Sequence, residues 1–323
     1  MPPDKHINGI DPSQPLEKCI IALYRLGIKE LEKQQNELKK NAGINEIHQT
    51  RVASRKLQTL FDIFGEIFPS KFYKENLKKI KSVISLLGGA RENDVSIKMI
   101  DAFAKTLEPG ERIALQLLSA RLRRGNHIEK EKLLRNKKVS KNIRKLKKGF
   151  LDRLSRGKKF RKTKYIHPKA SFKMNGVLII PRLFDGSMEF KKDVLDHPEN
   201  ERELHRMRIK AKPLRYALDT FSFAFPGAGF ADILKEVKFF VENLGLIHDI
   251  DVLIPLIRDY MQEIALYNKV CKTPEYRISL KPVNGFIRKL QSRRNAYFKE
   301  VNGILKKWDE DNFRERLILT LSN

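Results

Sequence analysis

The chain has 323 residues and carries 66 lysine and arginine residues against 39 acidic residues, which leaves a formal net charge of +27. A hydrophobic fraction of 41% is sufficient to bury a core and excludes a wholly disordered chain. So large a charge excess destabilises a compact state by self-repulsion. It therefore predicts a polyanionic partner, which is nucleic acid, an anionic membrane surface or another phosphate polymer.

The two cysteines, Cys19 and Cys271, lie far apart without the spacing of a metal site, as is typical of thiols in a reducing compartment. The polar, proline-rich start of the sequence is unlike a signal peptide. No apolar run reaches the roughly 18 residues of a membrane span, so we expect no membrane insertion. These features together favour a cytoplasmic protein.

Apolar residues at three- and four-residue spacing predict helices along most of the first half. Pro69 and the pair Gly88-Gly89 are expected to end two of them. A longer helical stretch follows, with Gly125 as a candidate break. The expected helices cover residues 15–40, 46–68, 74–87, 92–106 and 111–157.

Residues 161–182 interrupt this pattern with proline, glycine and a short Val-Leu-Ile-Ile run that is compatible with a small strand. We interpret the segment as the connection between two halves. Helical patterns then resume, over residues 200–225, 230–244, 249–266 and 284–308. Pro226 is expected to end the first of these helices and Gly245 the second.

Residues 46–100 and 203–257 are two copies of one segment, aligned without a gap at a constant offset of 157 and identical at 17 of 55 positions. The repeat predicts an all-α fold of two pseudo-symmetric four-helix bundles that arose by internal duplication. We expect a single domain over 10–311. Its parts are a first helical repeat over 10–160, a connection over 161–182 and a second helical repeat over 183–311.

A row of polar residues follows the first helix of each copy. At 100° per residue, His48, Arg51 and Arg55 share one face, opposite the apolar face. The equivalent row in the second copy is His205, Arg208 and Lys212. Each row spans about 10 Å along its helix, which suits a ligand that is anionic along a line. Arginine binds phosphate oxygens bidentately, and lysine adds a point charge.

A single basic helix face is usually only solvated, but two matching rows favour a binding role. Neighbouring arginines disfavour a bound cation, and no second ligand lies four residues from His48, so we expect no metal site. We see no sequence sign of a cofactor. His248 has no chemical partners in the sequence and is expected on the surface or in a loop. Asp94 and Asp251 are interpreted as helix N-terminal charges or as ion-pair partners of the arginine rows.

Residues 121–164 form a second basic feature, with 20 lysines and arginines against three acidic residues. The charges fall on several helical faces, which is unlike an amphipathic membrane helix. We interpret the segment either as an exposed arm that raises the local anion concentration or as a solvated, partly frayed helix.

The segments HQTRVASRKL and LLGGARENDV, and later LHRMRIKAKPLRYALD and LGLIHDIDVL, resemble the CHAD domain, the conserved-histidine α-helical domain. The resemblance covers roughly residues 10–310. It implies two four-helix bundles around a basic groove or pore that binds inorganic polyphosphate without catalysis. The positions that match the family's motifs are His48, Arg51, Arg55, Lys56, His205, Arg208, Lys212 and Arg215. Further candidates for the wall of the groove are Lys78, Lys81, Arg91, Lys235 and Lys238.

Two departures from the family pattern affect the second copy. Pro213 occupies a position where the family tends to have a basic residue, and it removes a backbone donor inside a helix. His248 and Asp249 stand where the first copy has Arg91 and an acidic neighbour.

Two other functions stay open beside polyphosphate binding. RNA or DNA binding, including non-specific binding, is favoured equally by the charge, but Tyr216 is the only aromatic residue on either row. Phosphotransfer through His48 or His205 is less favoured, because no phosphate-donor motif is present. We expect a protein that is not an enzyme and is cytoplasmic, with polyphosphate granules as a candidate place of association.

Overall fold

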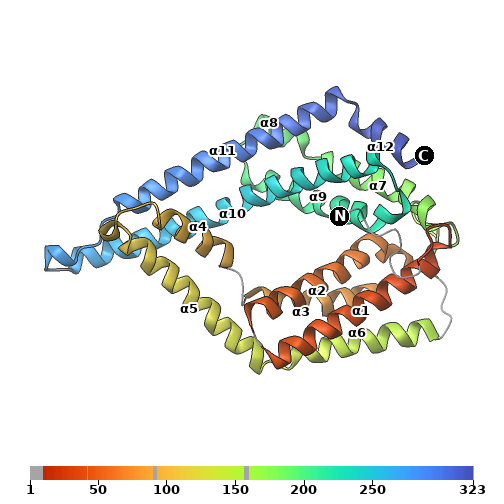
Figure 1. The fold of residues 1–323 in the computed structure, drawn as a ribbon, viewed down its shortest axis with the longest axis horizontal. Coiled ribbons are helices and arrows are strands. Elements are labelled where there is room, and N and C mark those ends of the chain that lie inside the picture. The colour runs from red at the N-terminus through yellow and green to blue at the C-terminus, as the bar shows by residue number, and fades with distance from the viewer. Residues whose placement is uncertain (1–9, 42, 90–92, 156–159, 323) are drawn as a thin grey trace.

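The structure, a computed structural model, describes residues 10–41, 43–89, 93–155 and 160–322 (Figure 1). Every regular element in these ranges is a helix, which confirms the predicted all-α fold class. The α-helices are α1 (Leu16–Lys40), α2 (Ile44–Phe64), α3 (Ser70–Gly89), α4 (Asp94–Ala104), α5 (Ile113–Arg135), α6 (Lys138–Ser155), α7 (Phe172–Met188), α8 (Lys191–Asp196), α9 (Glu201–Phe221), α10 (Ala228–Val270), α11 (Lys281–Glu310) and α12 (Phe313–Ser322). None of the described helices is long and apolar enough to cross a membrane.

The first bundle consists of α1, α2, α3 and α6, which pack on one another along their lengths (Figure 1). Its centre is aromatic. The ring of Tyr24 lies 4.7 Å from that of Phe61 and 4.7 Å from that of Phe150, measured between centroids. All three side chains are at most 2% exposed, so the apolar face expected for α2 is indeed the packed one.

The second bundle is formed by α7, α9, α12 and the adjoining parts of α10 and α11. The Val-Leu-Ile-Ile run that was compatible with a strand lies inside α7, so the strand expectation was wrong. Ser171 caps this helix by accepting a hydrogen bond from Met174 N, and Ile179 and Ile180 are fully buried. Helical spacing satisfies their backbone groups internally, which a strand without a partner does not.

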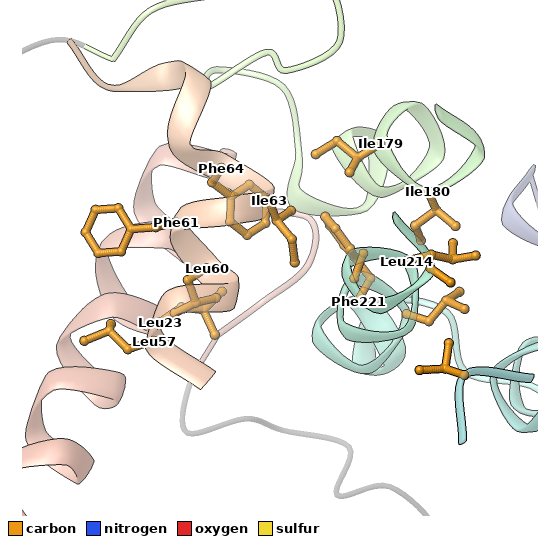
Figure 2. Close-up of a cluster of buried hydrophobic side chains, with 14 of the residues drawn as sticks. Leu23, Leu57, Leu60, Phe61, Ile63, Phe64, Ile179, Ile180, Leu214 and Phe221 are labelled. Carbon is orange, nitrogen blue, oxygen red and sulfur yellow. The ribbon is translucent and has the colours of Figure 1, made fainter. Parts of the chain in front are cut away.

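The two bundles share one hydrophobic core, because α2 packs against α9. Figure 2 shows Phe64 on α2 directed toward Phe221 on α9, and their ring centroids lie 5.8 Å apart. Phe172 of α7 completes the contact, at 4.5 Å from Phe221. A Cβ at Gly176 would lie 2.9 Å from the Phe221 ring, so this close approach requires glycine. The contact sets the spacing between the two helices that carry the basic rows.

A third group of helices extends away from both bundles and has its own core (Figure 1). It joins α4 and α5 of the first half to the C-terminal half of α10 and the N-terminal half of α11. The rings of Phe103 and Phe286 stack here at 4.9 Å. The helices therefore do not group by halves of the sequence, because α4 and α5 bury their apolar faces against helices of the other half.

Two predicted helix breaks differ from the structure. The break expected at Gly245 is absent, and α10 runs without interruption for 43 residues. The break in the basic run falls after Arg135 and not at Gly125, which lies inside α5. Asn136 accepts a hydrogen bond from the backbone N–H of Lys138 and thereby supports the start of α6.

The described part of the basic run consists of helices that pack into the fold. Leu133, Ile143 and Leu146 are buried in the core of the first bundle. The run is therefore neither a detached arm nor a frayed helix in its described residues, but most of its basic side chains are exposed, as expected for a solvated helix.

The two copies of the repeat have the same local structure at their starts. α2 spans Ile44–Phe64 and is followed by a 3-10 turn over Gly65–Ile67, while α9 spans Glu201–Phe221 and is followed by a 3-10 turn over Ser222–Ala224. These bounds correspond at the offset of the sequence repeat. The copies diverge afterwards, since α3 ends at Gly89 while α10 continues. The pseudo-symmetry and the duplication stay predictions.

Candidate functional site

A cavity of about 1100 Å³ lies between the two bundles and is closed on further sides by the ends of α3, α4 and α5. Arg51 and Arg55 of α2 and Arg208 and Lys212 of α9 line it together. Cations of both rows therefore face a single cavity, which helix phase alone did not show, while His205 is not among its lining residues. Among the described residues, the charged lining consists of five cationic side chains, Arg51, Arg55, Lys132, Arg208 and Lys212, and three carboxylates, Asp94, Glu129 and Asp249.

The cations of the two rows act on one another across the cavity. The pKa of Lys212 is lowered to about 8, first by burial and then by the charges of Arg208, Arg55 and Arg51, which outweigh the opposite effect of Asp249. Burial also lowers the pKa of Arg208, with Arg55 contributing. Burial and neighbouring cations therefore disfavour the charged forms of Lys212 and Arg208 in the protein alone. Arg208 Nε is buried and has no hydrogen-bond partner among the described residues.

A second cavity of about 420 Å³ adjoins the first. Arg55 and Lys212 line both cavities, so these two side chains stand at the boundary between them. The remaining lining residues of the second cavity are Gln58, Thr59, Asp62, Tyr73, Lys81, Ile209, Pro213 and Tyr216. Pro213 lies inside α9, which remains one continuous helix, so this departure from the family pattern shapes a wall and does not end the helix.

His248 lies in the site, so the expectation of a surface or loop position was wrong. It lines the larger cavity, and its Nδ1 is 3.3 Å from Nδ1 of His205. The pKa of His248 is lowered to about 4 by burial first, and then by Arg208, His205 and Lys212. At this distance one of the two facing nitrogens can donate a hydrogen bond to the other. Helix α10 brings His248 beside α9, a contact that spacing within the sequence does not reveal.

The two aspartates of the repeat have different partners. Asp94 lies in the first turn of α4, as expected, and accepts a hydrogen bond from Asn126 Nδ2 at 2.9 Å. Asp251 lies within α10 and binds Arg294 Nε of α11 at 2.6 Å, with both side chains largely buried. It therefore pairs with an arginine outside the rows. Within the part of the chain that the structure describes, no group of three or more His, Cys, Asp or Glu side chains is placed to hold a metal ion.

The remaining candidates are distributed more widely. His48 lines the larger cavity, and Lys81 lines the smaller one. Lys56 and Lys78 are exposed on α2 and α3 and line neither. Arg91 lies outside the described residues.

Lys235, Lys238 and Arg215 of the second copy lie apart from the larger cavity. Lys238 Nζ binds Asp219 at 3.0 Å, with Arg215 Nε at 3.9 Å from the same carboxylate. Lys235 lines a separate depression beside Glu236.

Sequence reasoning missed two residues of α5. Lys132 and Glu129 line the larger cavity and come from the basic run. The excess of basic residues there was a signal for binding, but it did not show which charges face inward.

The lowered pKa of Lys212 predicts a pH-dependent affinity for anions. A bound polyanion stabilises the charged lysine, so affinity falls as pH rises through the pKa of about 8 in the free protein. Between pH 7 and pH 9 we expect a decrease of up to about tenfold in polyphosphate affinity, measured by titration calorimetry. The Lys212→Arg variant keeps its charge throughout this range and should lose most of the decrease. An unchanged pH profile in this variant would contradict the assignment.

Comparison with known proteins agrees with the fold and the family. The family model for the CHAD domain matches residues 22–258. The crystal structure of the CHAD domain from the plant Ricinus communis is similar with a TM-score of 0.67 at 16% sequence identity, covering 95% of this chain and 96% of that one. The structure of PptA from Streptomyces chartreusis is similar with a TM-score of 0.61 at 12% identity, covering 92% of this chain and 99% of that one. No curated protein sequence matches significantly. The family match covers more than half of the sequence and includes both basic rows, so the chain belongs to the CHAD domain family.

Proposed function

We propose that this protein binds inorganic polyphosphate in the cavity between α2 and α9, without cleaving it. The observation that carries the proposal is the convergence of Arg51, Arg55, Arg208 and Lys212 on one cavity, where burial and neighbouring cations lower the pKa values of Arg208 and Lys212. Placing several cations close together in a partly buried site is unfavourable, so the arrangement favours a bound anion that stabilises their charged forms.

The shape of the basic surface favours a chain of phosphates over a single one. Each row extends about 10 Å along its helix. Four cations of the two rows, Arg51, Arg55, Arg208 and Lys212, line the larger cavity. Polyphosphate carries a negative charge at every unit, and it can therefore contact successive cations. The arginine forks bind its oxygens bidentately.

Nucleic acid is the alternative polyanion. Proteins that bind single strands usually stack bases on aromatic side chains, and the described residues that line the larger cavity include no Phe, Tyr or Trp. The net charge of +27 nevertheless favours non-specific attraction to any polyanion.

Binding without turnover is the second part of the proposal. The cations are spread along two helices instead of converging on one phosphoanhydride bond, which suits neutralisation of a chain more than attack on a single phosphorus atom. Incubation with long-chain polyphosphate should release no phosphate above the rate of a protein-free control. Release that depends on His48 or His205 would instead favour the phosphotransfer alternative.

Competition between polyanions tests the binding proposal. We expect long-chain polyphosphate to bind more tightly than single-stranded DNA or RNA of equal charge number at the same salt concentration, because affinity for any of them depends on salt. Titration calorimetry at two salt concentrations measures both the affinity and the number of phosphates neutralised. Equal affinities would refute a preference for polyphosphate.

A further inference from the structure

The smaller cavity differs chemically from the larger one. Two tyrosines, Tyr73 of α3 and Tyr216 of α9, line it, together with the apolar side chains of Ile209 and Pro213. An inorganic phosphate chain makes no use of aromatic rings. Its volume of about 420 Å³ lies within the range of roughly 300–1,000 Å³ that is usual for small-molecule sites.

The rings are held by the fold. Tyr73 packs against the turn that follows α2, where a Cβ at Gly65 would lie 2.2 Å from Tyr73 Cε2. Arg215 lies over the ring of Tyr216 at 5.8 Å. Both tyrosines are half-buried, so each retains accessible surface. Rings positioned in this way provide stacking surfaces at a low entropic cost.

The other lining residues place an amide and a carboxylate, with Lys81 close enough to act on that carboxylate, at one end of the cavity and two cations at the other. Gln58 Nε2 donates to Asp62 Oδ2 at 3.2 Å, and both side chains line the cavity. Arg55 and Lys212 lie at the boundary with the larger cavity. Arg55 and Asp62 are two turns apart on α2, which corresponds to about 10 Å along the axis. A ligand that matches has an aromatic group with hydrogen-bonding edges at one end and phosphates at the other.

We propose that the smaller cavity binds the base and ribose of a nucleoside polyphosphate, whose phosphate chain lies against Arg55 and Lys212. The inference rests on the proposed phosphate binding at these two cations. The contribution of the tyrosines to nucleotide affinity can nevertheless be measured separately. Base stacking is tolerant of base identity, while the amide of Gln58 and the carboxylate of Asp62 provide acceptors for the amino groups of a base.

Titration calorimetry with ATP, GTP and inorganic tripolyphosphate, at one salt concentration, tests this proposal. Tripolyphosphate carries at least as much charge as either nucleotide, so electrostatics alone predicts no preference for the nucleotides. We expect at least one of the nucleotides to bind about tenfold more tightly than tripolyphosphate, because of stacking. The double variant Tyr73→Leu with Tyr216→Leu keeps apolar volume and removes the aromatic faces, and it should abolish this preference while leaving tripolyphosphate affinity unchanged.

Tyr165→Leu is the matched control, because Tyr165 lines neither cavity. Circular dichroism and the melting temperature establish that each variant is folded, and a variant that unfolds is replaced by the corresponding single substitution. If tripolyphosphate binds but neither nucleotide binds better, or if the preference survives in the double variant, the nucleoside site is refuted and the proposed polyphosphate function stands. If none of the three ligands binds, both proposals fail.

Discussion

Reversing two charges at the boundary between the cavities, in the double variant Arg55→Glu with Lys212→Glu, is expected to weaken long-chain polyphosphate binding by at least about a hundredfold. Both side chains line both cavities, so a phosphate chain that passes between α2 and α9 contacts them. A hydrogen bond to a charged group contributes about 1.5–3 kcal/mol, and two such contacts are lost. The introduced carboxylates also repel the ligand. Affinity is measured by titration calorimetry at fixed salt and pH 7.

A control variant with the same change in net charge distinguishes the loss of local contacts from a weaker overall electrostatic attraction. Lys39 and Lys299 are exposed on α1 and α11, outside both cavities. The double variant Lys39→Glu with Lys299→Glu changes the net charge by the same amount. It should lower affinity only a few-fold, since charges far from the ligand are screened over about 10 Å at 0.1 M salt. Equal losses in the two double variants would mean that the polyanion binds to the general surface and not in the cavity.

Replacing Phe221 with alanine is expected to lower the free energy of unfolding by about 3–5 kcal/mol, because a fully buried aromatic ring leaves a cavity that the surroundings fill only in part. Phe221 has 0% exposure and contacts both Phe64 and Phe172. These three rings join α2, α7 and α9. Urea denaturation monitored by circular dichroism measures the change.

Phe221→Leu is the matched variant, since it keeps most of the apolar volume. It should destabilise the protein by roughly 1–2 kcal/mol, well below the alanine variant. Comparable losses for the two substitutions would indicate that the aromatic contact with Phe64, and not the buried volume, stabilises the contact between the bundles.

Helix content and the identity of the basic rows could be predicted from local sequence. The three- and four-residue spacing of apolar side chains and the turn residues Pro69 and Pro226 act within a few residues, so their effects can be read along the chain. The 3-10 turns that follow α2 and α9 lie directly before these two prolines. The same local periodicity placed Arg51 and Arg208 away from the apolar faces, and both line the larger cavity.

At Gly245 and in the Val-Leu-Ile-Ile run, tertiary packing outweighed the local conformational preference of the sequence. Gly245 was expected to end a helix, but α10 is held on both sides of it by separate cores, through Leu244 and Ile247 in one and Ile250 in the other. Burial on this scale outweighs the roughly 1 kcal/mol that a glycine costs inside a helix. The apolar run by itself was compatible with either a strand or a helix. Packing of Ile179 and Ile180 in the core of the second bundle stabilises the helix.

The sequence by itself determined the all-α fold and the two rows, and it predicted a polyanionic partner, because charge, periodicity and repeat are properties of the chain alone. Only the tertiary structure decided that cations of both rows share one cavity, that His248 lies beside His205, and that Tyr73 and Tyr216 line a second cavity together. Each of these pairs joins residues from different helices. Their proximity depends on packing between α2, α3, α9 and α10, which involves contacts between residues distant in sequence and has no signature in local spacing.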